Sequence, residues 1–158
     1  MTNIKNVLII CSGNTARSPA AKYLAKFYAN KKNLNINFSS AGFFNAFTYM
    51  QPESRAFLDK KNIDHSDFSP QTINRDLLEK QDLIITMERS HKTQISNNYS
   101  NIDRISEKIY TLKEFNGEMT SLDIEDPYYT SNSRYKEILK IIDENVEKMI
   151  QKIKENAY

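Results

Sequence analysis

The sequence is poor in the residues that build disulfides and metal centres: its 158 residues include one cysteine, two histidines and no tryptophan. A single cysteine excludes a disulfide within the chain and any zinc or iron–sulfur site that needs several cysteines. Two histidines do not by themselves make a histidine-rich catalytic metal site. The chemistry of this chain is therefore expected to come from other side chains or from its one thiol.

An excess of charge of one sign is also lacking, since 22 Lys and Arg stand against 20 Asp and Glu. Nucleic-acid binding depends on clustered excess Lys and Arg, so we expect no nucleic-acid partner. The mostly apolar stretch at 7–12 is far shorter than a signal-peptide core or a membrane span. We expect a cytoplasmic protein without membrane contact, whose residues 1–158 form a single domain.

Short apolar runs alternate with amphipathic segments along the chain. The Val-Leu-Ile-Ile run is typical of a strand buried on both faces, and strands are expected at 7–10, 36–40, 82–87 and 109–112. Helices are expected at 18–31, 52–61, 74–80, 88–95 and 133–154. The last helix has one apolar stripe for core packing, formed by Ile138, Ile142, Val146, Met149 and Ile153.

This alternation, without repeats or linkers, predicts an α/β fold. We expect a three-layer sandwich in which a four-stranded parallel sheet is flanked by helices. Ligands of such sheets lie beyond the carboxyl ends of the strands. Because Cys11 directly follows the first strand, the loop between strand 1 and helix 1 is the expected binding site.

That loop has the composition of a phosphate-binding site. Cys11 is followed after five residues by Arg17, and then by Ser18 and Pro19, a good N-cap and a good first helical residue. Backbone N–H groups and the helix dipole favour a phosphate there, and Arg17 adds a planar fork of donors that a lysine lacks. A cysteine at a helix N-terminus beside a cation ionises easily, so Cys11 is a candidate nucleophile and Ser18 a candidate donor to its sulfur.

Each of these residues has a plainer interpretation when taken alone. A lone cysteine at a strand end is usually a small buried hydrophobe, and Ser-Pro needs no more explanation than helix capping. The joint pattern favours function over these interpretations. Gly13 and Asn14 fit it as well, because the loop must turn tightly and both residues tolerate positive φ.

A phosphocysteine formed from an ester needs an acid for the leaving group and then a base for water, and one carboxyl can serve as both. The best candidate is Asp126, in the Asp-Pro-Tyr-Tyr segment after the fourth strand. Pro127 stiffens this turn, and Tyr128 and Tyr129 can wall an aromatic substrate. Turn initiation is the plainer interpretation of Asp-Pro.

At these residues the sequence resembles the low-molecular-weight protein-tyrosine phosphatases, from the first strand to the last helix. The family's loop C-x-G-N-x-x-R-S-P is matched by Cys11, Gly13, Asn14, Arg17, Ser18 and Pro19. Its D-P-Y-Y acid loop is matched by Asp126, Pro127, Tyr128 and Tyr129, and its Ser-Ala-Gly stretch by Ser40, Ala41 and Gly42.

The resemblance implies a phosphatase that hydrolyses phosphotyrosine of a phosphorylated protein through a phosphocysteine, with no metal or other cofactor. It implies that Cys11 is the nucleophile, that Arg17 binds the phosphate, and that Asp126 is the general acid and then the base. Ser18 would stabilise the thiolate. The implied phosphate loop is Ser12, Gly13, Asn14, Thr15, Ala16, Arg17 and Ser18, and the implied substrate cleft is Phe44, Phe47, Tyr128 and Tyr129.

The sequence departs from the family pattern at the thiol and in the cleft. Many members carry a second cysteine just before the arginine, where this chain has Ala16. Cys11 is therefore expected to be open to over-oxidation or to capping by small thiols. The tryptophan that often lines the cleft is absent, and Phe44, Phe47 or Tyr49 are candidates for its role.

The bracing of the loop also departs from the pattern. The resemblance implies that Ser40 and Asn14 brace the loop, with support from a histidine. That histidine is displaced here, with Asp67 near its place and His65 two residues earlier. His65 and His91 are otherwise interpreted as surface or capping residues.

Thr15 leaves the substrate open. The family's protein-arginine phosphatases carry threonine at this loop position, whereas its tyrosine-specific members usually carry an apolar β-branched residue. The Ser-Pro at 69–70 and the Thr-Leu-Lys-Glu-Phe run at 111–115 also look like the arginine branch. The adjacent Tyr128 and Tyr129 favour the tyrosine branch. Phosphotyrosine is the preferred substrate, with phosphoarginine as the alternative.

Other functions are compatible with parts of the pattern. Arsenate reductases share the loop but relay electrons through further cysteines, which this chain lacks. A phosphocysteine carrier of a sugar transport system has no need of Arg17, and a non-catalytic phosphopeptide-binding module has no need of Asp126. We expect a monomer or a weak dimer.

Overall fold

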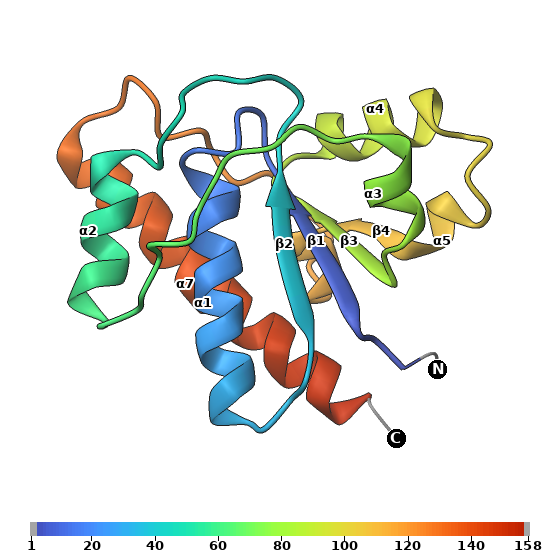
Figure 1. The fold of residues 1–158 in the computed structure, drawn as a ribbon, viewed down its shortest axis with the longest axis horizontal. Helices are drawn as coiled ribbons and strands as arrows, with labels where there is room; N and C mark the ends of the chain where they lie inside the picture. The colour runs from blue at the N-terminus through green and yellow to red at the C-terminus, as the bar shows by residue number, and fades with distance from the viewer. Residues whose placement is uncertain (1–2, 157–158) are drawn as a thin grey trace.

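The computed structural model describes residues 3–156 and contains one four-stranded sheet (Figure 1). All neighbouring strands are parallel, and their order is β2-β1-β3-β4. The central strand β1 pairs with both neighbours, so that Val7 lies opposite Phe38 on one side and Leu83 on the other. The strands are β1 (Asn6–Ile10), β2 (Asn37–Ala41), β3 (Leu83–Thr86) and β4 (Ile109–Thr111).

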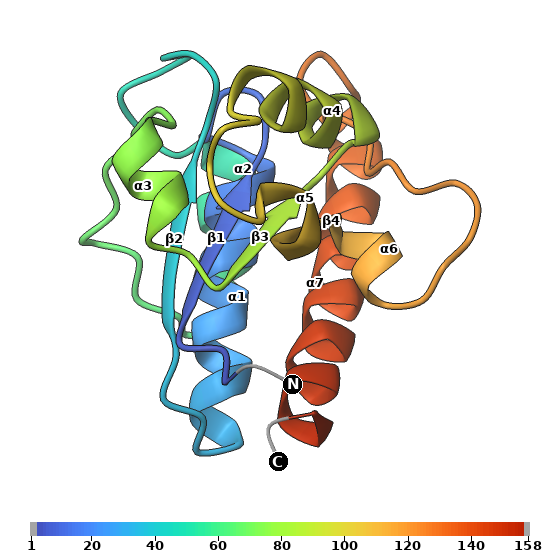
Figure 2. The same cartoon turned by 90° about the vertical axis from the view of Figure 1, so that its right-hand side faces the viewer.

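One face of the sheet is covered by α1 (Arg17–Lys31) and α7 (Asn132–Glu155), and α2 (Pro52–Lys60) packs against these two helices (Figures 1 and 2). Val7 and Ile9 of β1 point to this side and join a buried cluster with side chains of the three helices. The expected stripe of α7 is buried in it, which confirms the predicted packing of that helix.

The opposite face is covered by α3 (Arg75–Glu79), α4 (Arg89–Asn98) and α5 (Ile105–Lys108). Leu8 and Ile10 point to this side and pack with Leu78, Ile95 and other apolar side chains. The strand β1 is therefore apolar at every position from Val7 to Ile10 because both of its faces are buried. The predicted three-layer sandwich with a four-stranded parallel sheet is confirmed.

The structure corrects the expected start of the first helix. α1 begins at Arg17, and its N-cap is Ala16, which makes no side-chain capping bond. Ser18 and Pro19 are therefore the second and third helical residues. The Ser18 hydroxyl does not cap the helix, because it is turned toward Cys11 and Asn14.

Two one-turn helices flank β4 and were not expected from the sequence. α5 precedes the strand, and α6 (Leu112–Phe115) follows it. α6 is closed by a capping box in which Thr111 accepts from the Glu114 N–H and Glu114 accepts from the Thr111 N–H. Helices this short give no periodic signal. Within residues 3–156, no helix has both the length and the apolar character needed to cross a membrane.

Candidate active site

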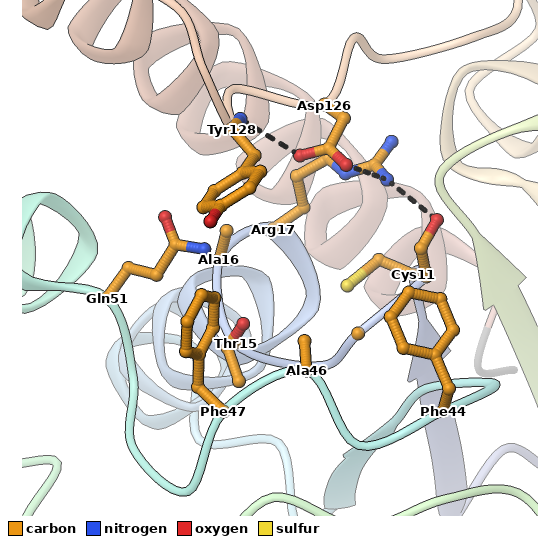
Figure 3. A pocket seen from close by; sticks show the side chains of 12 residues that line it. Cys11, Thr15, Ala16, Arg17, Phe44, Ala46, Phe47, Gln51, Asp126 and Tyr128 are labelled. Atoms are coloured by element: carbon orange, nitrogen blue, oxygen red, sulfur yellow. Dashed lines mark hydrogen bonds and ion pairs between the residues drawn. The ribbon is translucent and has the colours of Figure 1, made fainter.

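A cavity of about 320 Å³ lies where the loop after β1 meets the loops after β2 and β4 (Figure 3). The position beyond the carboxyl ends of parallel strands is the one expected for a ligand site in this fold. It is lined by Cys11, Ser12, Gly13, Thr15, Ala16, Arg17, Phe44, Ala46, Phe47, Gln51, Asp126 and Tyr128.

Cys11 is 2% exposed, and its sulfur points into this cavity (Figure 3). The Sγ atom lies 3.0 Å from the Ser18 hydroxyl and accepts from the Ser18 N–H at 3.4 Å. Ser18 in turn donates its hydroxyl proton to Asn14 Oδ1 at 2.9 Å. A protonated thiol can donate to the Ser18 oxygen, and a thiolate can receive the hydroxyl proton instead. Ser18, at the start of α1, therefore offers a hydrogen-bond partner to both the thiol and the thiolate of Cys11.

The shape of the loop depends on Asn14, which has φ +54°. Its Nδ2 donates to the backbone carbonyls of Ser40 and Gln71, each at 3.4 Å. Gln71 Nε2 also donates to the Ser40 carbonyl at 3.0 Å. The implied bracing by Ser40 thus comes from its backbone oxygen. Neither Ser18 nor Asn14 lines the cavity. Their side chains bond to each other, and Asn14 also bonds to the backbone of Ser40 and Gln71.

Gly13 is required for a reason other than the expected positive φ. Its φ is not in the left-handed region, but a Cβ there would lie 2.7 Å from the Cβ of Ala46. Gly42 is more tightly placed, since its Cβ would meet the Ser12 carbonyl oxygen at 2.7 Å and the Asn14 nitrogen at 2.8 Å. The loop after β2 therefore presses its backbone directly against the phosphate loop.

The backbone N–H groups of 12–17 are available to a ligand. Within residues 3–156, none of them donates to a carbonyl of a turn or loop, and the first turn of α1 offers them no helical acceptor. Donors at a helix N-terminus favour an anion, since they carry part of the positive end of the helix dipole. The arrangement fits the anion cradle that the sequence predicts.

Arg17 is 1% exposed, and it lines the cavity next to Asp126 (Figure 3). Nη1 donates to Glu88 Oε2 at 2.5 Å and to the Ile124 carbonyl at 2.7 Å. Nη2 donates to Ser12 Oγ at 3.3 Å and lies 3.7 Å from an Asp126 carboxylate oxygen. These partners compensate the buried charge and fix the plane of the fork at the edge of the cavity.

His91 is buried against the site, which corrects its interpretation as a surface or capping residue. Its Nε2 lies 3.0 Å from Ser12 Oγ and 3.7 Å from Glu88 Oε2, and its ring packs on Phe43 at 5.2 Å between centroids. Its Nδ1 has no partner among the described residues. Burial lowers the pKa of His91, an effect that the Glu88 carboxylate opposes and the Arg17 charge reinforces.

The other two polar residues considered for bracing the loop lie elsewhere. His65 pairs with the exposed Asp59 at 2.7 Å, and Asp67 accepts from the Tyr23 hydroxyl at 2.7 Å. Neither contacts Asn14, whose side chain is held by the Gln71 carbonyl instead. The backbone carbonyl of Gln71 therefore stands where the family pattern has a supporting histidine.

Asp126 hangs over the cavity with its side chain 48% exposed (Figure 3). Its loop is fixed to the sheet where the Ile124 N–H donates to the Met87 carbonyl at 2.8 Å, directly after β3. The carboxylate accepts from the Tyr128 N–H at 3.1 Å, which turns the other oxygen toward Arg17. A carboxyl so placed can exchange protons with both solvent and a group bound in the cavity.

Aromatic side chains form the walls of the cavity. Phe44, Phe47 and Tyr128 line it as expected, and the rings of Phe47 and Tyr128 are 5.7 Å apart (Figure 3). The structure places Tyr129 outside this cavity, where its side chain is 93% exposed. Tyr49 also lies outside, with its ring 5.5 Å from Phe47.

Four residues of the site were missed by sequence reasoning: Glu88, His91, Gln51 and Ala46. A signal existed for Glu88, since it follows the third strand at the same edge of the sheet as Cys11. His91 is one turn further along α4 on the same side, within 3.7 Å of Glu88. Gln51 and Ala46 belong to an irregular loop, whose path no periodicity predicts.

Comparisons with known proteins agree with this geometry. The profile of the family described as low molecular weight phosphotyrosine protein phosphatase matches residues 6–158. A protein-arginine-phosphatase of Bacillus subtilis is 30% identical over 154 residues, covering 96% of this chain and 98% of that protein. The low molecular weight protein-tyrosine-phosphatase PtpB of Staphylococcus haemolyticus is 33% identical over 132 residues, covering 83% and 87%.

Solved structures give the same result. A low molecular weight protein tyrosine phosphatase from T. tengcongensis superposes with a TM-score of 0.82 at 31% identity, covering 94% of this chain and 99% of that one. The arginine phosphatase YwlE, in a Cys-to-Ser variant with a phosphorylated active-site serine, gives a TM-score of 0.86 at 28% identity, covering 96% and 97%. The chain is a phosphatase and belongs to the low molecular weight phosphotyrosine protein phosphatase family.

Proposed function

We propose that this phosphatase hydrolyses phosphotyrosine side chains of proteins through a phosphocysteine on Cys11. The observation that carries the proposal is the meeting of three groups in one cavity: the Cys11 sulfur, the buried guanidinium of Arg17 and the carboxylate of Asp126 (Figure 3). The phosphorylated serine in the YwlE variant supports a covalent phosphoryl step at the equivalent position of that protein.

In the first step the Cys11 thiolate attacks phosphorus, and the bond between phosphorus and the tyrosine oxygen breaks. Asp126, as the neutral acid, gives its proton to the leaving oxygen, so that tyrosine departs uncharged. Arg17 and the free N–H groups of 12–17 surround the phosphoryl oxygens, where negative charge is held during the transfer.

In the second step the Asp126 carboxylate takes a proton from water, and the resulting oxygen attacks the phosphorus of the phosphocysteine. The sulfur–phosphorus bond breaks, inorganic phosphate forms, and the Cys11 thiolate is regenerated. The Ser18 hydroxyl, 3.0 Å from the sulfur, stabilises the departing thiolate by donating to it. Asp126 is protonated again and ready for the next cycle.

This geometry supports catalysis over the two non-hydrolytic alternatives. A carrier that only passes on its phosphoryl group gains nothing from a carboxyl placed over the cavity, yet Asp126 is there with its Oδ2 3.7 Å from Arg17. A binding module has no use for a thiol directed at the ligand.

We further propose that residues 1–158 act as one domain, as a monomer or a weak dimer. The cytoplasm is its proposed location, because the proposed reaction needs a reduced Cys11 and thiols are kept reduced in that compartment.

Phosphoarginine is the second candidate substrate, and Thr15 is the observation that favours it. Thr15 is almost fully buried and lines the cavity beside Phe47. A hydroxyl there offers a hydrogen-bond partner to a guanidinium, whereas an apolar residue would offer none. The similarity to the Bacillus subtilis relative named as a protein-arginine-phosphatase also favours phosphoarginine.

The deciding experiment compares kcat/KM for matched phosphotyrosine and phosphoarginine peptides, in the natural protein and in Thr15→Ile. We expect the phosphotyrosine peptide to be the better substrate of both proteins. Thr15→Ile should lower activity on phosphoarginine by about tenfold or more, because a polar group of the substrate loses its partner. A strong phosphoarginine preference that Thr15→Ile reverses would make the protein an arginine phosphatase.

A further inference from the structure

A second hollow of about 400 Å³ lies beside the candidate active site. It shares Phe47, Gln51 and Tyr128 with the catalytic cavity, so the two spaces are separated by a single wall of side chains. Side chains along an extended peptide follow one another at about 3.3 Å per residue. A residue one or two positions from the phosphorylated one therefore reaches the second hollow while the phosphate is in the loop.

The second hollow is surrounded by exposed aromatic faces. Tyr49, Tyr128 and Tyr129 are 51%, 43% and 93% exposed, which is unusual for side chains of this size. Their rings form a contiguous row with Phe47 in tilted contacts: the centroids of Tyr49 and Tyr128 lie 5.5 and 5.7 Å from that of Phe47, and the centroid of Tyr129 lies 4.1 Å from that of Tyr128. Such ring faces bind cations, because their quadrupoles present negative charge.

The charge of the second hollow has the matching sign. Among the described residues that line it, Glu53 alone is charged, and no basic side chain of residues 3–156 lies within 4.0 Å of its carboxylate as an ion-pair partner. Arg134, in the first turn of α7, is already held by Glu125 and Glu137.

The buried Tyr135 on the wall of the second hollow lies close enough to Glu53 for the two to interact electrostatically. Burial is the main cause that raises the pKa of Tyr135, and the charges of Glu53 and Asp126 act in the same direction, while the hydrogen bond with Ser54 opposes them. Of these two carboxylates, Glu53 belongs to the lining of the second hollow. A cationic group placed there would be attracted by the charge of Glu53.

We propose that the second hollow binds a lysine or arginine side chain that flanks the phosphorylated residue of the protein substrate. The cation lies against the ring faces of Tyr49 and Tyr128, and its charge is paired with Glu53. This inference rests on the proposed function, because it assigns a second contact to the same substrate. It gives the enzyme a preference for phosphorylated residues in basic surroundings.

The test measures kcat/KM for a series of peptides that carry the better of the two phosphorylated residues and, at each of the two positions on either side, Lys, Ala, Leu or Glu in turn. At one position we expect Lys to exceed Ala by about tenfold, mainly through KM, and Glu to be worse than Ala. The advantage of Lys should shrink in high salt, because an exposed ion pair is screened.

The carboxylate is tested in Glu53→Gln and Glu53→Lys. The first should remove most of the Lys advantage, and the second should reverse it in favour of Glu. Glu147→Gln is the matched control, since it removes an equal charge from an exposed position of α7 next to Tyr28 and should leave the preference unchanged. All three variants should hydrolyse a small aryl phosphate as the natural protein does.

Two results would overturn the inference without touching the proposed function. If all peptides are hydrolysed equally, or if Leu matches or exceeds Lys, the second hollow does not select a cation. Retention of the Lys preference in Glu53→Lys would likewise contradict the role of Glu53. Loss of the proposed function itself would look different, because then neither the peptides nor the small aryl phosphate would be hydrolysed.

Discussion

At the scale of single residues, the site depends on a buried arginine whose charge is compensated before any substrate arrives. Glu88 and the Ile124 carbonyl both accept from Nη1 of Arg17, while Nη2 donates to Ser12 and lies 3.7 Å from the Asp126 carboxylate. An arginine without such partners would be costly to bury. Lysine at this position would keep the charge but lose the planar fork that the proposed function uses to hold phosphate oxygens.

His91 holds the same network from the side of α4, and it predicts a pH dependence of stability. Its folded pKa is below the ordinary value of about 6.5, chiefly because the site buries it. Below that pH the unfolded chain binds a proton that the folded protein does not. The stabilising contribution of neutral His91 is therefore complete above the ordinary pKa. It is lost progressively as the pH falls from the ordinary pKa through the lower pKa of the folded state.

The measurement is the free energy of unfolding from urea titrations between about pH 7.5 and pH 5. His91→Gln keeps an amide that can donate to Ser12 but does not titrate. We expect the natural protein to lose stability more steeply on acidification than this variant does. Parallel curves for the two proteins would contradict the buried, neutral state of His91.

At the scale of elements, the phosphate loop is shaped by the loops that press on it. A Cβ on Gly42 would meet backbone atoms of Ser12 and Asn14 at under 3 Å, whereas the one contact that short for a Cβ on Gly13 would be with the methyl group of Ala46. Backbone cannot yield without deforming the phosphate loop, but a methyl group can be removed. The two glycines therefore differ in whether a second substitution can restore the site.

We expect Gly42→Ala to lower stability by about 1–3 kcal/mol and to reduce kcat strongly, since overpacking displaces the loop. Gly13→Ala should also impair activity, and adding Ala46→Gly should restore much of it. Thermal melting and kcat on a small aryl phosphate are the readouts. Equal rescue of Gly42→Ala by Ala46→Gly would show that the contacts of the two glycines are not separable in this way.

The sequence predicts the elements that carry strong signals. The apolar run at 7–10 predicts β1, because a strand buried on both faces needs an apolar residue at every position. The five-residue stripe predicts α7, because a helix buried on one face needs apolar residues at every third or fourth position. The one-turn helices α5 and α6 carry no such period. Ser18 shows a different limit of prediction from sequence. A serine that caps a helix and a serine that contacts the Cys11 sulfur stand at nearly the same position, so the sequence does not distinguish the two roles.

At the scale of the whole molecule, the sheet order explains why the site assembles from distant segments. With β1 between β2 and β3, the loops that follow these strands meet around Cys11, and they contribute Gly42 and Glu88. The Asp126 loop joins them through the bond between Ile124 and Met87. The sequence predicts the loop from the spacing of Cys11 and Arg17, and it offers Asp126 as the candidate acid because of its place after the fourth strand. The partners of Arg17 could be found only in the fold, since they are 71 and 107 residues away.

The central claim is that phosphate passes through a covalent bond to Cys11, and rapid mixing followed by acid quench tests it most directly. The enzyme is mixed with excess aryl phosphate for less than one turnover, digested and analysed by mass spectrometry. We predict one phosphoryl group on the Cys11 peptide of the natural protein, and no turnover in Cys11→Ser. Turnover at a near-normal rate in Cys11→Ser, or a phosphoryl group found on another side chain, would contradict the account.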